Sequence, residues 1–175
     1  VACAIDDEAQ NHQLMLLHGA QGKGKSTFVR HLLPPELKDY YRNGMISPDN
    51  KDHLLQMSSC LLINLDEFDT LSPARMQELK SLITQDVMNE RKVYDIQNYT
   101  FIRRASFIAS TNNPHCLPDI GENRRILFNT LLEIDYHTPV NHQGIYAQAY
   151  ALYRQGFQYW YENQEITFLN NRNEA

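Results

Sequence analysis

The sequence contains few cysteines and no excess of positive charge. Its three cysteines, Cys3, Cys60 and Cys116, are odd in number and widely spaced among 175 residues. They therefore provide neither a disulfide framework nor a Cys-x-x-Cys metal site, and a reducing compartment fits them best. Lys and Arg number 16 against 21 Asp and Glu, which gives a formal net charge of −5. Contact with a polynucleotide must then be local, because the surface as a whole is acidic.

Long apolar runs are missing as well, and so is a basic, apolar N-terminus. No segment reaches the length that crosses a bilayer, and Asp6, Asp7 and Glu8 stand where a signal peptide would be basic or apolar. We therefore expect a cytoplasmic protein without a membrane partner. A hydrophobic content of 42% is sufficient for one globular core, and a start at Val1 instead of Met indicates a domain cut from a longer protein.

Glycine is scarce, yet three of the seven glycines fall within residues 19–26, Gly-Ala-Gln-Gly-Lys-Gly-Lys-Ser. An apolar run at 14–18 precedes this stretch, and an apolar-patterned segment follows it. The spacing predicts a phosphate-binding loop between a strand and a helix, with Lys25 at the β- and γ-phosphates and Ser26 on Mg²⁺. The residues expected to bind the nucleotide are Gly19, Gln21, Gly22, Lys23, Gly24, Lys25, Ser26 and Thr27.

Acidic residues follow the next buried strand. The run at 60–65 is almost continuously apolar, as expected of a strand buried on both faces of a parallel sheet, and Asp66-Glu67 comes where it ends. Beside a phosphate-binding loop, Asp66 is expected to help hold Mg²⁺ and Glu67 to orient the attacking water.

A polar amide and two arginines complete the predicted catalytic set. Asn112 follows a buried strand at 105–110, where its side chain can contact the γ-phosphate or the attacking water. Arg124 and Arg125 precede an apolar strand expected at 126–134. They are expected to stabilise transition-state charge on a nucleotide, in their own subunit or in a neighbouring one.

Capping and periodicity predict two further helices. One covers 25–33 and ends at Pro34-Pro35, which cannot continue a helix. The other begins with Ser72 as N-cap and Pro73 at the first helical position, and its apolar residues recur at helical spacing up to Val87. Further expected elements include a short strand near 45–46, a short helix that carries Leu54, Leu55 and Met57, and an aromatic-rich helix over 141–162 whose stripe belongs to a core or an interface.

The stretch 91–104 combines basic and aromatic residues. Its pattern predicts a small hairpin or two short strands, at 93–96 and 99–102. The candidates for contact with a nucleic-acid backbone are Arg91, Lys92, Arg103 and Arg104. A solvated edge whose arginines pair with neighbouring acids is an equally good interpretation of the same residues.

The segments GAQGKGKS, LLINLDEFD, FIASTNN and GENRRILF, in this order and spacing, resemble the virulence-associated E family. These proteins are P-loop ATPases of phages, plasmids and mobile islands, related to superfamily-3 helicases within the AAA+ group. The resemblance covers roughly residues 14–161. It implies an α/β three-layer sandwich with a parallel sheet ordered 5-1-4-3-2, ATP and Mg²⁺ as cofactors, and assembly into a homo-oligomeric ring. It also implies DNA unwinding or replication initiation, often with a primase domain upstream.

The sequence thus predicts a single P-loop ATPase domain over 1–175, with a lead-in at 1–13, a nucleotide-binding core at 14–134 and a C-terminal helix at 141–162. Two functions stay open. The domain is either the ATP-hydrolysing motor of a helicase-type DNA-replication protein, which contacts DNA through flanking domains or the basic hairpin, or an ATP-dependent assembly switch or defence module that unwinds nothing. A small-molecule kinase is a weaker third interpretation, because it needs an acceptor-binding lid between the loop and the acidic motif.

Overall fold

The computed structural model describes residues 1–66, 68–91, 98–117, 123–161 and 165–169. Its elements, with η for a 3-10 helix, are α1 (Ala2–Ile5), β1 (Leu14–His18), α2 (Lys25–Arg30), η1 (Pro35–Tyr40), β2 (Tyr41–Asn43), α3 (Lys51–Ser59), β3 (Leu62–Leu65), η2 (Phe68–Thr70), α4 (Pro73–Ile83), β4 (Val87–Arg91), β5 (Asn98–Ile102), β6 (Ser106–Thr111), β7 (Ile126–Thr130) and α5 (His142–Arg154).

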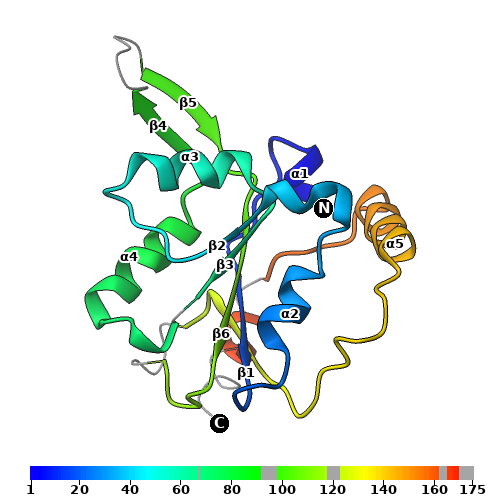
Figure 1. Ribbon diagram of the computed structural model, residues 1–175. Helices are drawn as coiled ribbons and strands as arrows, with labels where there is room; N and C mark the ends of the chain where they lie inside the picture. The colour runs from blue at the N-terminus through cyan, green and yellow to red at the C-terminus, as the bar shows by residue number, and fades with distance from the viewer. Residues whose placement is uncertain (67, 92–97, 118–122, 162–164, 170–175) are drawn as a thin grey trace.

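A parallel sheet of five strands, in the order β2-β3-β6-β1-β7, forms the centre of this α/β fold (Figure 1). If only the five strands of this sheet are numbered, in chain order, the order read from β7 is 5-1-4-3-2. If the two strands of the separate hairpin are also counted, the same order is written 7-1-6-3-2. Strands β4 and β5 pair antiparallel in a separate hairpin. Because all five central strands run the same way, their carboxyl ends meet at one edge of the sheet.

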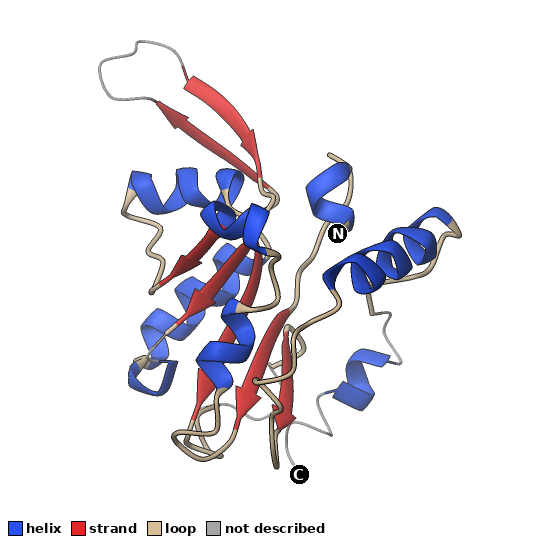
Figure 2. Cartoon of the chain, turned by 45° about the vertical axis from the view of Figure 1, so that its right-hand side comes forward, coloured by secondary structure: helices blue, strands red, loops and turns tan. Residues whose placement is uncertain are grey.

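Alternate residues of the central strands pack on opposite faces of the sheet. Leu14 and Leu16 of β1 are fully buried in a large cluster with residues of α3 and α4. Leu17 packs instead with Val29 of α2 in a smaller cluster. Figures 1 and 2 show the resulting layers, with α3 and α4 on one side of the sheet and α2 and α5 on the other.

Both predicted helices end earlier than their patterns indicate. Helix α2 stops at Arg30, three residues short of the expected end. Leu33 precedes Pro34, and the residue before a proline is disfavoured in the helical region. Helix α4 begins as predicted, with the Ser72 side chain accepting from the Arg75 N–H, but it ends at Ile83. The prediction that Val87 belongs to it is wrong, because Val87 starts β4.

The edge strand and the hairpin also differ from expectation. The edge strand is Tyr41–Asn43 and not 45–46; its polar residues are tolerated because an edge strand has a partner on one side only. In the hairpin, Asn98–Ile102 confirms the second predicted strand, and its partner is Val87–Arg91. The predicted strand at 93–96 lies outside the described residues. Strand β7 ends at Thr130, short of the expected 134.

Helix α5 is shorter and more exposed than its aromatic pattern indicates. It starts after Asn141, whose side chain accepts from the Gly144 N–H, and it ends at Arg154, before Gly156 with a φ of 75°. None of its residues is buried, so the aromatic stripe is not part of a core, and the interface alternative stays a prediction. Hydrogen bonds from Tyr146 and Tyr153 nevertheless attach it to Leu32 and Asp6. Among the described residues, no helix has the length and apolar character needed to cross a membrane.

Candidate functional site

Three predicted segments meet at the carboxyl edge of the sheet. Residues 19–24 follow β1, Asp66 follows β3 and Asn112 follows β6. Strand β6 lies between β1 and β3 in the sheet, so their carboxyl ends are adjacent. The parallel topology therefore gathers residues that are far apart in the sequence, as predicted for Lys25 and Asn112.

The loop after β1 depends on two glycines in the left-handed region. Gly22 has a φ of 78° and Gly24 a φ of 82°, conformations that other residues rarely adopt. A Cβ at Gly22 would meet nothing within 4 Å, whereas one at Gly24 would lie 2.0 Å from the Tyr136 ring. The loop is thus open beside Gly22 and tightly covered beside Gly24. Gly19 is buried, and the exposed members of the predicted set are Gln21, Gly22, Lys23, Ser26 and Thr27.

Lys25, the first residue of α2, is the charged centre of this edge. It is only 8% exposed, and its Nζ donates to the Gly19 and Ala20 carbonyl oxygens at 2.5 and 2.9 Å. A third bond, of 2.7 Å, runs from Nζ to Asn112 Oδ1. Burial lowers the pKa of the Lys25 ammonium, and the negative charge of Asp69 opposes this shift. A buried cation within this ring of oxygens is suited to bind an anion that replaces the carbonyls.

Asp69 is a functional candidate that our sequence reasoning missed. One carboxylate oxygen accepts from Thr111 Oγ1, and the other accepts from the Asn112 N–H at 3.2 Å. Asp69 therefore fixes the end of β6, where Asn112 reaches Lys25. The available signal was the spacing of acids in Leu-Asp-Glu-Phe-Asp, of which only the first two were assigned a role.

Asp66 accepts a hydrogen bond from one amide, Asn43 of β2, which is itself bonded to a second amide, Asn64 of β3. Its Oδ2 accepts from Asn43 Nδ2 at 3.0 Å, and Asn43 Oδ1 accepts from Asn64 Nδ2 at 2.6 Å. Sequence reasoning missed both asparagines, although a polar residue inside the apolar run Leu-Leu-Ile-Asn-Leu was a visible signal for Asn64. Glu67, the predicted water-orienting residue, lies outside the described residues.

The oxygen donors at this edge fit a cation that arrives with a phosphate. Within the ranges that the structure describes, no three His, Cys, Asp or Glu side chains gather in a cluster able to hold an ion. Mg²⁺ usually keeps several waters and binds one or two carboxylates together with phosphate oxygens. Asp66 and the exposed hydroxyl of Ser26 match that kind of donor set.

Arg124 and Arg125 lie at the opposite edge of the sheet. The Leu14 N–H at the start of β1 donates to the Arg125 carbonyl oxygen at 2.7 Å. At a rise of about 3.3 Å per residue, β1 itself then separates this point from the glycine-rich loop by about 13 Å. The structure therefore does not bring the arginine pair together with Lys25 in one chain. The own-subunit role that was one of our two expectations has no support in this arrangement.

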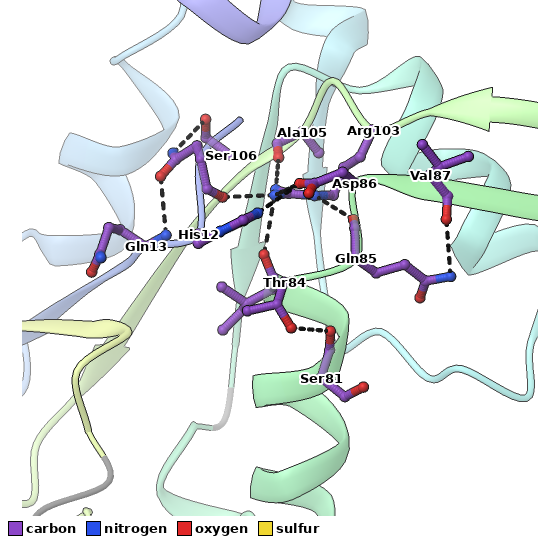
Figure 3. A network of polar contacts seen from close by, with 12 residues as sticks. His12, Gln13, Ser81, Thr84, Gln85, Asp86, Val87, Arg103, Ala105 and Ser106 are labelled. Carbon is purple, nitrogen blue, oxygen red and sulfur yellow. Dashed lines mark hydrogen bonds and ion pairs between the residues drawn. The ribbon is translucent and has the colours of Figure 1, made fainter. Parts of the chain in front are cut away.

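Arg103 is a structural residue, and its predicted contact with nucleic acid is wrong. It is 5% exposed, stacks over the Phe107 ring and lies 3.5 Å from Asp86, which also contacts His12 (Figure 3). Its guanidinium donates at 2.7–3.0 Å to the carbonyl oxygens of Asn11, Ile83, Gln85 and Ala105. Burial lowers the pKa of Arg103, and Asp86 opposes that shift.

Arg104 is the other predicted nucleic-acid residue whose side chain the structure describes. Arg104 is partly buried, donates to the Cys3 carbonyl oxygen and pairs with Asp7. Arg103 and Arg104 each pair with a nearby acid, as the alternative interpretation expected, but Arg103 is buried and does not lie on a solvated edge. Arg91 ends β4, but its side chain, like all of Lys92, lies outside what the structure describes.

The protein is an α/β domain with a parallel sheet. At the carboxyl edge of this sheet lie a glycine-rich loop, the buried Lys25, and Asp66, which accepts a hydrogen bond from Asn43. The chain belongs to the virulence-associated protein E-like domain family, whose model matches residues 1–175. The family resemblance seen in the sequence motifs is thereby confirmed. A search of curated proteins found no match to the chain.

Solved structures of the C-terminal region of NrS-1 are similar to this chain. The A-form apo structure of residues 305–718 has a TM-score of 0.51 at 15% identity and covers 95% of this chain and 34% of that one. A further apo structure of the same region has a TM-score of 0.50 at 17% identity, with 94% and 36% covered. At these identities the likeness shows the fold alone. The chain spans about a third of the length of those structures.

Proposed function

We propose that this domain is a P-loop ATPase of the AAA+ group, the Mg²⁺-dependent ATP-hydrolysing motor of a helicase-type DNA-replication protein. The observation that carries the proposal is the ammonium of Lys25, buried beneath the glycine-rich loop and bound to two loop carbonyls and Asn112. A phosphate that displaced those carbonyls would gain a desolvated cation and a loop shaped by two left-handed glycines. Membership of the virulence-associated protein E-like domain family supports the same assignment.

Each residue at the carboxyl edge has a role in this proposal. Lys25 binds the β- and γ-phosphates as a point charge, and its bond to Asn112 makes that amide a sensor of the same phosphate. Asp66 and Ser26 hold Mg²⁺, which when bound neutralises charge on the phosphates. Glu67 orients the attacking water, and the other loop residues of the predicted set surround the phosphate chain through their backbone N–H groups.

The arginine pair acts on a neighbouring subunit in our proposal. Because Arg124 and Arg125 lie at the edge opposite the glycine-rich loop, a head-to-tail contact would place them against the loop of the next copy. Repeated contacts of that kind close into a ring when the rotation permits. We therefore propose a homo-oligomeric ring in the full-length protein, which contacts DNA through flanking domains or the hairpin and has a primase domain upstream.

A second candidate is an ATP-dependent assembly switch or defence module without unwinding activity. Arg103 and Arg104 favour it, because two of the four cations proposed for DNA are engaged inside the domain. In that case ATP binding would order a partner surface, and turnover would not depend on DNA.

Steady-state ATP hydrolysis by the full-length protein, with and without single-stranded DNA, tests the two candidates. The motor predicts DNA-stimulated hydrolysis that Lys25→Ala abolishes and that the matched control Lys38→Ala, at an exposed position in η1, leaves intact. Hydrolysis that is equal with and without DNA would favour the switch. Absence of both ATP binding and hydrolysis in the wild type would overturn the assignment as an ATPase.

A further inference from the structure

A chain of amides runs from the interior of the sheet to Asp66. Asn64 is 0% exposed in β3 and is the register partner of Asn43 in the edge strand β2. Asn64 Nδ2 donates to Asn43 Oδ1 at 2.6 Å, and Asn43 Nδ2 donates to Asp66 Oδ2 at 3.0 Å. The three side chains thus form one continuous path of hydrogen bonds that ends on the carboxylate.

Charge at the end of this path fixes the orientation of both amides. An ionised carboxylate only accepts hydrogen bonds, so Asn43 must present its NH₂ group to Asp66. The Asn43 oxygen then faces Asn64, which must donate in turn. The Tyr41 hydroxyl, 3.5 Å from the same Asn43 oxygen, is also a donor and agrees with this orientation. If either amide group were rotated to exchange its oxygen and nitrogen, two acceptors or two donors would face each other.

The path lies on the face of the sheet that is covered by α2, the helix that follows the glycine-rich loop. Side chains alternate along a strand, so residues 62, 64 and 66 share one face. Leu62 packs against the cluster that includes Val29 of α2, which places Asn64 and Asp66 on the α2 side. The other face of β3 carries Ile63 and Leu65 in the large apolar cluster.

An amide in the fully buried position of Asn64 needs a physical reason. Burying an amide costs free energy that an apolar residue would not. Among the described residues Asn64 Oδ1 has no hydrogen-bond partner, so the bond from Nδ2 offsets only part of that cost. The bond of Asn64 to Asn43 contributes nothing to the packing of the apolar cluster on the opposite face. Its evident consequence is to hold Asn43 in the orientation that donates to Asp66.

We propose that Asn43 is the positioning residue of Asp66: its amide binds Oδ2 and so fixes how the carboxylate is presented to the divalent cation that accompanies the nucleotide. Asn64 acts through Asn43 by fixing its amide. The inference rests on the proposed function, because it assigns the support of the same metal-binding carboxylate. Partners of metal-binding carboxylates, when removed, typically reduce metal affinity about 10–100-fold.

The test compares Asn43→Leu, which keeps the approximate shape and removes the donor, with Arg42→Leu at the neighbouring exposed position of β2. Electron paramagnetic resonance would measure Mn²⁺ binding to the ADP complex of the full chain. Nucleotide affinity would be measured separately with a chelator present. We expect Asn43→Leu to weaken Mn²⁺ binding about 10-fold or more without changing the cation-free nucleotide affinity. Arg42→Leu should match the wild type in both measurements.

Each other outcome has a definite meaning. Wild-type protein that binds no nucleotide with or without the cation would refute the proposed function itself. Normal nucleotide binding by the wild type, with unchanged Mn²⁺ affinity in Asn43→Leu, would overturn the role of Asn43 and leave the proposed function standing. Equal loss of cation-free nucleotide affinity would show a merely structural role and also overturn the inference. If Asn43→Leu does not fold, Asn43→Ala replaces it; failure of both to fold would likewise mean a structural role.

Discussion

Replacement of Arg103 by methionine should greatly lower the denaturant concentration at which this domain unfolds. The guanidinium donates to four carbonyl oxygens. One of these, on Ile83, belongs to the last turn of α4, where helix carbonyls lack partners within the helix, and another, on Gln85, lies just beyond the helix. Arg103 therefore joins the lead-in segment, the end of α4 and the base of the hairpin at one point (Figure 3). Methionine would fill part of the volume and satisfy none of the acceptors.

The size of the loss follows from burial. A single hydrogen bond to a charged group contributes about 1.5–3 kcal/mol, but the four share one cation and are not additive. Asp86 is 26% exposed and keeps its contact with His12, so its unpairing adds little. Leaving one buried acceptor unsatisfied costs about 1–3 kcal/mol, and because Arg103→Met leaves several unsatisfied at once we expect a loss of at least about 3 kcal/mol. Against a total stability of about 5–15 kcal/mol for an ordinary domain, this is a large fraction.

Urea unfolding followed by circular dichroism measures the effect. Arg75→Met is the matched control, because the Arg75 side chain is 52% exposed and pairs with Glu78 on the surface, where such pairs contribute about 0–1 kcal/mol. Arg103→Lys should recover little, since an ammonium cannot reach carbonyls on several sides at once. A free energy of unfolding for Arg103→Met within about 1 kcal/mol of wild type would refute this reasoning, because it is no more than the cost of leaving a single buried acceptor unsatisfied.

Three further predictions concern the carboxyl edge. Asp69→Asn should slow hydrolysis and move the alkaline loss of ATP affinity to lower pH, because burial already lowers the pKa of Lys25 and only the charge of Asp69 opposes that shift. Fluorescence anisotropy across a pH series would measure the ATP affinity, and coincident curves for the wild type and the variant would contradict the prediction. Glu67→Gln should keep ATP binding and slow turnover, since an amide cannot polarise water; unchanged turnover in assembled protein would remove this role. An Arg124→Ala, Arg125→Ala double variant mixed with Lys25→Ala should regain part of the hydrolysis that each lacks alone, because an arginine supplied in trans is worth about 10³–10⁵ in turnover. No recovery in mixtures shown to co-assemble would exclude action in trans.

The central strands were predictable because their burial leaves a plain signal. Strands β3 and β6 are buried on both faces, β1 is buried except at Met15 and the partly exposed His18, and each of the three reads as a short, nearly continuous apolar run. Residues that follow such strands meet at one edge of a parallel sheet, so the amino-acid sequence alone was enough to group Lys25, Asp66 and Asn112. The same rule places Arg124 and Arg125 at the opposite edge, because they precede their strand. The expectation that they act on a nucleotide bound in their own subunit conflicts with this rule.

Elements that depend on tertiary contacts were not predictable from local pattern. The C-terminal end of α4 is set by Arg103, which is 20 residues from Ile83 in the sequence. Helical periodicity continues to Val87 without any sign of that contact. Strand β2 is polar because only one of its edges is paired, so Asn43 showed neither apolar alternation nor a motif. Its role appears only when the register sets it opposite Asn64.

Calorimetric titration of ATP with Mg²⁺ into the wild type and Lys25→Ala tests the central claim most directly. The wild type should bind one nucleotide per chain, and Lys25→Ala should lose most of the affinity, because the Lys25 ammonium is the buried cation within reach of both the loop carbonyls and Asn112. Lys38→Ala, at an exposed position in η1, should bind as the wild type does. Equal affinity of the wild type and Lys25→Ala would contradict the account.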